Sequence, residues 1–154
     1  MMIFRVAGVA LLLLAAGRAD GGPEKSADVV EVKLERFTIA DGLESFFVSL
    51  KVAEGWHVYA NPAGAKALAD SATTVEFLID GKRAATNDIY YPEGVVRKGA
   101  AGDEYRAYEG SVSFTGWLVW DDTKDAKAIS VRVRVVAADG KTRLKGSVIA
   151  AEVR

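Results

Sequence analysis

The chain has 154 residues, half of them hydrophobic, which is enough for one domain with a sizeable core. Its 20 basic and 21 acidic residues nearly cancel, so the composition gives no reason to expect nucleic acid or an anionic membrane as a partner. The absence of cysteine excludes structural disulfides, thiol catalysis and cysteine-ligated metals.

The first residues have the pattern of a signal peptide. Arg5 precedes an apolar run over residues 6–17, and the small side chain of Ala19 suits cleavage after that residue. An uncleaved anchor is the alternative, although the run is shorter than the ~20 residues that span a bilayer. We expect a signal peptide over 1–19, a flexible leader over 20–28 and a folded domain over 29–154. The domain is then periplasmic or otherwise exported to the cell envelope, with no membrane span after cleavage.

Most of the remaining chain alternates apolar and polar residues, which is the pattern of half-buried strands. The expected strands cover residues 30–35, 46–52, 75–79, 89–91, 111–120, 129–136 and 147–153. No window has a convincing helical period, and residues 61–71 form one helical turn at most. The sequence therefore predicts an all-β, immunoglobulin-like antiparallel β-sandwich of about seven to nine strands, with a small barrel as the alternative.

The longest expected strand, 111–120, contains a glycine and two tryptophans. Alternation places Val112, Phe114, Leu118 and Trp120 on its inward face, and Gly116 marks a bulge or a close approach of another segment. Trp117 falls on the opposite face. Beside exposed tyrosines it would be a contact patch for a protein or a sugar.

Three motifs carry a resemblance to a known family. They are Glu54-Gly-Trp-His-Val-Tyr-Ala-Asn-Pro-Ala-Gly64, Tyr91-Pro92-Glu93-Gly94, and Glu104-Tyr-Arg-Ala-Tyr-Glu-Gly-Ser-Val112. In order and spacing they resemble the N-terminal domain of DsbD-type thiol:disulfide interchange proteins, over residues 29–153. The first motif has one extra residue, Ala63, before its final glycine.

The resemblance implies a cysteine pair near the end of the domain, which this chain lacks. Ala138 and Arg143 stand where the two cysteines would fall, Leu144 is retained, and Gly146 replaces a proline. Thiol–disulfide exchange needs a thiolate, so the chain is expected to be redox-inactive. In that family the pair passes electrons from a membrane reductase to thioredoxin-like proteins, and an aromatic cap covers it. Here Tyr105 and Tyr108 occupy the cap loop, as core residues or as a reused contact surface.

We therefore expect an exported, non-catalytic binding module with a protein partner in the cell envelope. Its candidate contact residues are Trp56, His57, Tyr59, Asn61, Tyr105, Tyr108, Glu109 and Trp117. One alternative is an accessory protein that docks a thioredoxin-like protein or a membrane reductase in a thiol-redox or cytochrome-maturation system. A weaker one is a carbohydrate-binding or hydrolytic sandwich.

Metal and enzyme chemistry find little support in the sequence. His57 is the only histidine, and its neighbours Glu54 and Asn61 make a poor zinc set. Asp121, Asp122 and Asp125 do not have the spacing of an EF-hand and are typical of a solvated turn. We expect no metal, no cofactor and no catalytic group, because no serine lies in a nucleophile elbow and no carboxylate pair is fixed in a cleft.

Overall fold

The computed structural model describes residues 21–153, so the predicted signal peptide lies outside the described residues. No helix in this part of the chain is long and apolar enough to cross a membrane. The elements in chain order are the 3₁₀ turn η1 (Ser26–Asp28), β1 (Val30–Ala40), β2 (Leu43–Val52), β3 (His57–Tyr59), η2 (Lys66–Ser71), β4 (Thr74–Ile79), β5 (Lys82–Arg83), β6 (Asp88–Tyr90), β7 (Val95–Lys98), β8 (Glu104–Tyr108), β9 (Ser111–Val119), the helical turn α1 (Trp120–Thr123), β10 (Ile129–Val135), β11 (Ala137–Ala138) and β12 (Ser147–Val153).

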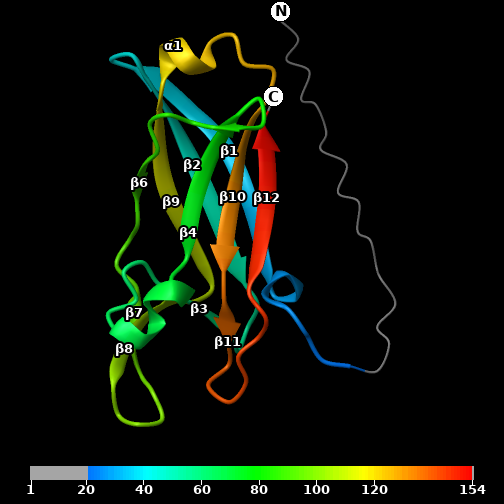
Figure 1. The fold of residues 1–154 in the computed structure, drawn as a ribbon, viewed down its shortest axis with the longest axis vertical. Coiled ribbons are helices and arrows are strands. Elements are labelled where there is room, and N and C mark those ends of the chain that lie inside the picture. Colours follow the sequence, from blue (N-terminus) through cyan, green and yellow to red (C-terminus); the bar gives the residue numbers. More distant parts are fainter. Residues whose placement is uncertain (1–20, 154) are drawn as a thin grey trace, which may run out of the picture.

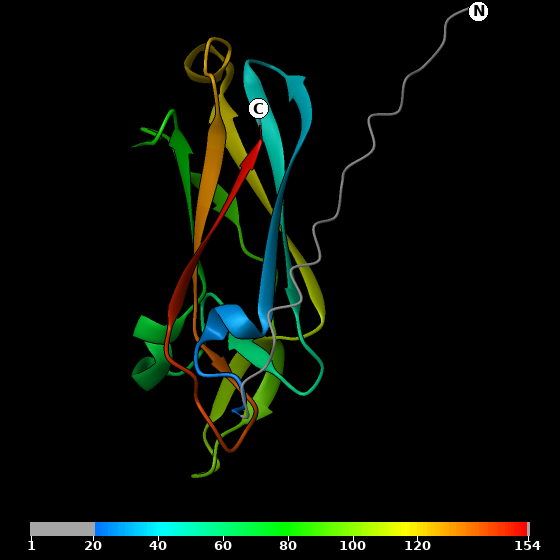
Figure 2. The same ribbon diagram turned by 90° about the vertical axis from the view of Figure 1, so that its right-hand side faces the viewer.

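Three antiparallel sheets build the domain. The first has the strand order β1-β2-β9-β6, the second β12-β10-β4-β5, and the third and smallest β11-β3-β8-β7. The first two face each other along the length of the molecule, and the small sheet lies at the end opposite α1 (Figures 1 and 2). The prediction of an all-β sandwich is confirmed.

Residues 21–153 form twelve strands, more than the seven to nine that we expected. The extra strands are all short, with five residues or fewer, and most of them belong to the small sheet. The pattern of alternation is too brief in such strands to separate them from loops. One of them, β8, includes Tyr105 and Tyr108, which we expected on a loop.

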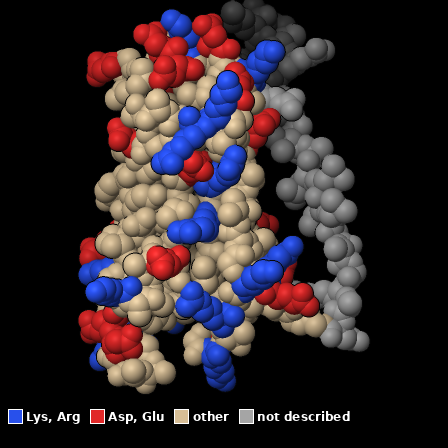
Figure 3. All heavy atoms as spheres, in the orientation of Figure 1, with Lys and Arg blue, Asp and Glu red and all other residues tan. Residues whose placement is uncertain are grey.

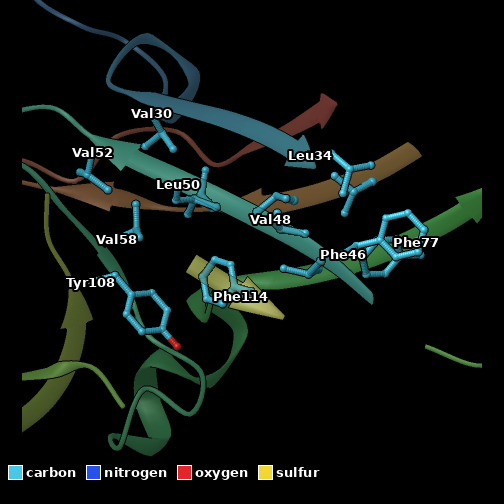
Figure 4. Packing of buried hydrophobic residues seen from close by; sticks show 14 of the residues in the cluster. Val30, Leu34, Phe46, Val48, Leu50, Val52, Val58, Phe77, Tyr108 and Phe114 are labelled. Carbon is cyan, nitrogen blue, oxygen red and sulfur yellow. The ribbon is translucent and has the colours of Figure 1, made fainter. Parts of the chain in front are cut away.

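The interior between the two long sheets is filled by the inward positions of their strands. Phe46, Phe77 and Phe114 are completely buried, and the ring centroids of Phe46 and Phe77 lie 5.4 Å apart. Figure 4 shows these rings together with the aliphatic side chains of β1 and β2. Strict alternation of burial along β2 and β10 confirms that these strands have one face in the core.

Strand β9 has a close approach at its glycine and no bulge. Gly116 pairs with Phe46 in an unbroken register, and a Cβ atom at Gly116 would lie 2.2 Å from Cε2 of Phe77. The strand ends one residue earlier than expected, because Trp120 begins α1 and is only half-buried. The prediction that Trp120 belongs to the inward row of the strand was therefore wrong.

The last residues of the predicted leader are part of the packed domain. Ser26 is fully buried, its hydroxyl donates to the carbonyl of Lys145 at 2.9 Å, and the backbone N–H of Ala137 donates to that hydroxyl at 2.9 Å. Lys25 also forms a β-bridge with Lys145. The turn at Lys25 and Ser26 thus packs against the main domain and supports β11.

Charges of both signs are spread over the surface. In the orientation of Figure 3, basic side chains follow the middle of the visible face and acidic ones flank them. Arg132 and Arg134 of β10 are exposed, as their alternation predicted. The mixture agrees with the near-neutral composition, and a mixed surface favours no particular polyanion.

Candidate functional site

A pocket of about 410 Å³ opens at the small sheet, between two hairpin turns. Its floor is formed by side chains of β3, β8 and β11, and η2 supplies Ala67 and Leu68. One wall is the tip of the β7–β8 hairpin, at 99–101 and Asp103, and the other is the turn at 140–143. The volume lies in the range of small-ligand and side-chain pockets. We call it the Ala138–Arg143 pocket.

Ala138 and Arg143 face each other across the turn as partners in an antiparallel bridge. The backbone N–H of Asp139 donates to the carbonyl of Thr142 at 3.1 Å, and that of Leu144 donates to the carbonyl of Ala137 at 2.9 Å. These bonds flank the pair, which makes it the narrow, non-hydrogen-bonded type with Cα atoms about 4.5 Å apart. A disulfide bridges Cα atoms about 4.4–6.8 Å apart. The backbone therefore suits a cystine at these positions.

The turn between the two positions is held by its own acidic residue. The carboxylate of Asp139 accepts hydrogen bonds from the backbone N–H groups of Lys141, at 2.9 Å, and Thr142, at 2.6 Å. These bonds lower the pKa of Asp139 below its ordinary value. Gly140 has a φ of +90°, a conformation that glycine adopts without steric cost. The turn is thus fixed from within.

Three of the predicted contact residues meet in a cluster of rings below this turn. Ring centroids are 5.8 Å apart for His57 and Tyr59, 5.8 Å for His57 and Tyr105, and 5.6 Å for Tyr59 and Tyr105. His57 is 1% exposed and Tyr105 is 9% exposed. Nε2 of His57 and the hydroxyl of Tyr105 share a hydrogen bond of 3.1 Å, whose donor depends on the histidine tautomer. The cluster forms a rigid aromatic floor.

Arg143 lies across this floor. Its guanidinium carbon is 5.5 Å from the ring centroid of Tyr59, within cation–π range. Its Nη2 donates to the hydroxyl of Ser71 at the end of η2. Nothing in the sequence linked Ser71 to Arg143, because the two are 72 residues apart and serine is common in turns.

Tyr108 and Asn61 have structural roles beside the pocket rather than in it. The hydroxyl of Tyr108 donates to the carbonyl of Pro92 at 2.9 Å and accepts the backbone N–H of Asn61 at 3.2 Å. The side-chain amide of Asn61 donates to the carbonyl of Thr73 at 3.0 Å. Tyr108 is 3% exposed and packs on Phe114, as Figure 4 shows. Tyr108 is thus a core residue, whereas Tyr105 lines the pocket.

The remaining predicted contact residues are dispersed. Trp56 is half-buried against the main core, and Glu109 forms an ion pair with Arg97. Trp117 lies on the outer face of the first sheet, opposite Ser45 and Asp88, and is half-buried. Two exposed rings on the same sheet are Phe37, at 64%, and Tyr90, at 60%. The pocket therefore brings together His57, Tyr59, Tyr105, Ala138 and Arg143, and leaves Trp117 elsewhere.

Acidic residues do not gather into a metal site in the described part of the chain. Asp121 and Asp122 lie on α1, and Asp121 pairs with Lys124 at 2.9 Å. An ion pair between side chains three residues apart is typical of a solvated helical turn.

Burial of His57 gives a prediction on acid stability. Desolvation, followed by the nearby charge of Arg97, lowers the pKa of His57 below its usual value of 6.5. The unfolded chain then binds more protons at this site than the folded chain between 6.5 and the folded pKa. The free energy of unfolding should fall as the pH drops through this window, and level off below it. Urea titrations of wild type and His57→Phe from pH 7.5 to 4.5 measure the effect.

The His57→Phe variant is the matched comparison, since phenylalanine fills a similar volume and does not titrate. Its free energy of unfolding should change less over the same pH range. Asp28 and Asp139 have pKa values lowered below 3.8, so their contributions are lost only at more acid pH. An identical pH dependence in both proteins would mean that His57 is protonated as easily in the fold as in water.

Comparison with known proteins yields a match of structure only. No family model matches the chain, and no curated protein matches its sequence. The crystal structure of the N-terminal periplasmic domain of ScsB from Proteus mirabilis superposes with a TM-score of 0.57 at 13% identity, over 81% of this chain. A protein of Archaeoglobus fulgidus matches 80% of this chain and 94% of its own, at 11% identity and a TM-score of 0.39, too low to bear on the fold.

The chain spans 45% of the length of the ScsB domain structure. That likeness supports the DsbD-like fold that the three sequence motifs predict. At 13% identity, the structural likeness is evidence for the fold alone.

Proposed function

We propose that this chain is an exported, non-catalytic binding module whose docking surface is the Ala138–Arg143 pocket. The observation that supports it most is the narrow backbone pair at Ala138 and Arg143, which has the geometry for a cystine and carries no thiol. The cluster of rings around this pair and the open space between the two hairpins are available to bind a partner. A site with its frame intact and its nucleophile absent is able to bind but not to exchange disulfides.

The class of partner follows from the family resemblance. A thioredoxin-like protein or a membrane reductase of the envelope would dock here as it docks on a thiol-bearing relative, and no electrons would pass. Export is supported by the signal-peptide pattern over 1–19 and by a structural neighbour that is itself a periplasmic domain. The chain then acts as an accessory of a thiol-redox system, by holding a partner rather than reducing it.

A single cysteine placed in the pocket tests this function. In Ala138→Cys, which leaves Arg143 in place, the new thiolate in the pocket would attack one sulfur of a docked partner's disulfide, form a mixed disulfide and release the other sulfur as a thiolate. Envelopes from cells making this variant are quenched with acid, alkylated and analysed by non-reducing electrophoresis and mass spectrometry. We expect thioredoxin-like proteins to be captured.

Lys82→Cys is the matched control, because Lys82 is exposed on β5 of the second sheet, away from the pocket. It should capture no thioredoxin-like protein, or far less. Equal capture from both positions would show that the new thiol reacts by collision. No capture of a thioredoxin-like protein from Ala138→Cys would count against docking at this site.

A further inference from the structure

We infer that the Ala138–Arg143 pocket receives a carboxylate side chain with an apolar neighbour, presented by a segment of the partner protein. This rests on the proposed docking function and specifies what is docked. The charges around the pocket, the apolar floor and the fixed position of one guanidinium carry the inference.

Arg143 is a fixed cation without an acidic partner. The ring of Tyr59 lies on one side of the guanidinium and Ser71 accepts one of its hydrogen bonds. Within residues 21–153, the arginines at 36, 83, 97 and 106 each pair with a glutamate, but Arg143 does not. A guanidinium has five N–H donors in a planar fork, so several remain for a ligand. Because the fork is already positioned, a ligand loses less side-chain entropy on binding it.

The acidic residue of the turn that holds Arg143 does not line the pocket. Lys141, Thr142 and Arg143 line the pocket, whereas Asp139 does not. The carboxylate of Asp139 is occupied by two backbone N–H groups of the turn. This wall thus offers two cations and a hydroxyl to an incoming group. A carboxylate forms charge-assisted hydrogen bonds with such donors.

The floor of the pocket calls for an apolar neighbour beside that carboxylate. Tyr59, Tyr105, Leu68 and Ala138 supply it, and the hydroxyl of Tyr105 is already bonded to His57. Burial of an aliphatic or aromatic side chain against these groups is favourable in proportion to the area covered. Both features occur together in a peptide with an acidic residue next to a leucine.

The opposite wall of the pocket limits how much negative charge the ligand can carry. Asp103 at the tip of the β7–β8 hairpin also lines the pocket. It would repel a second acidic group on the ligand, so a single carboxylate flanked by neutral residues is favoured over a polyacidic run.

Binding of two short peptides tests the inference. The probes are acetyl-Gly-Leu-Glu-Leu-Gly-amide and the same peptide with Gln in place of Glu, titrated into the ¹⁵N-labelled mature domain and followed by NMR. We expect the Glu peptide to shift the amide signals of the turn at 138–143 and to bind about tenfold more tightly than the Gln peptide, as a charge-assisted hydrogen bond predicts. Arg143→Gln should remove this difference, and Arg143→Lys, which keeps the charge without the fork, should retain part of it.

Arg132→Gln is the control, because Arg132 is an exposed arginine on the outer face of β10. It should leave both affinities unchanged. Equal binding of the two peptides, or unchanged discrimination in Arg143→Gln, would overturn the inference and leave the proposed docking function standing. If N-acetylleucine alone binds as tightly as the Glu peptide, the site takes a free organic acid and the peptide source is wrong. If the cysteine variant captures no thioredoxin-like protein but the Glu peptide still binds more tightly than the Gln peptide, the carboxylate site stands and the thioredoxin-like partner is wrong.

Discussion

Gly116→Ala is expected to lower the free energy of unfolding by about 3 kcal/mol, at the upper end of overpacking effects. A Cβ atom at this position would lie 2.2 Å from Cε2 and 2.6 Å from Cζ of Phe77. The ring of Phe77 is fully buried and packs on Phe46, so it has no free space to move into. Urea unfolding followed by tryptophan fluorescence measures the loss.

Two further variants identify the ring as the cause. Phe77→Leu in the Gly116→Ala background removes the clashing atoms, so the double variant should cost less than the sum of the single changes. Gly22→Ala is the neutral control, because no atom lies within 4 Å of a Cβ built there. A Gly116→Ala protein as stable as wild type would mean that β9 and β4 are not packed face to face.

Arg36→Met is expected to lower the free energy of unfolding by about 3 kcal/mol, because it leaves a buried charge without a partner. Glu44 is completely buried on the inward face of β2, and its Oε1 lies 2.6 Å from Nε of Arg36. Neither carboxylate oxygen of Glu44 accepts a hydrogen bond from the described residues. Arg36 is 40% exposed, so solvent screens the pair and the cost lies at the low end for a buried ion pair.

The double variant Arg36→Met/Glu44→Leu should recover most of the lost stability, because replacing both charges removes the desolvation cost. The exposed pair between Arg83 and Glu76, at 3.3 Å, provides a matched comparison. Arg83→Met should cost less than about 1 kcal/mol. A loss in the double variant as large as in Arg36→Met would contradict this explanation and point to packing by the arginine itself.

The long strands could be predicted because alternation of apolar and polar residues over seven or more positions indicates a half-buried β-strand. Val48, Leu50 and Val52 lie in the core as their spacing indicated. The same rule places Glu44 two residues before Phe46 on the buried face, although its charge argued for the surface. Strand β8 was missed because Tyr105 and Tyr108 are out of phase in a five-residue segment next to a glycine.

The candidate site could be predicted only in part. The family resemblance implied that Tyr105 and Tyr108 cover the positions of Ala138 and Arg143, and the structure places Tyr105 in one pocket with those two residues but not Tyr108. The sequence contained no signal for Ser71. A hydrogen bond between two turns produces no periodic pattern in the sequence of either turn. Such a contact can therefore be identified only in the folded structure.

We propose that the site keeps the backbone geometry of a thiol-exchange site without its cysteines. The most direct measurement is the redox state of Ala138→Cys/Arg143→Cys, by thiol alkylation and mass spectrometry after purification in air. We predict a spontaneous intramolecular disulfide, since the two residues form a narrow bridge pair. Ala138→Cys/Lys145→Cys is the control, because diagonal neighbours lie about 7–8 Å apart and should stay reduced. Two free thiols in the first variant would contradict the account.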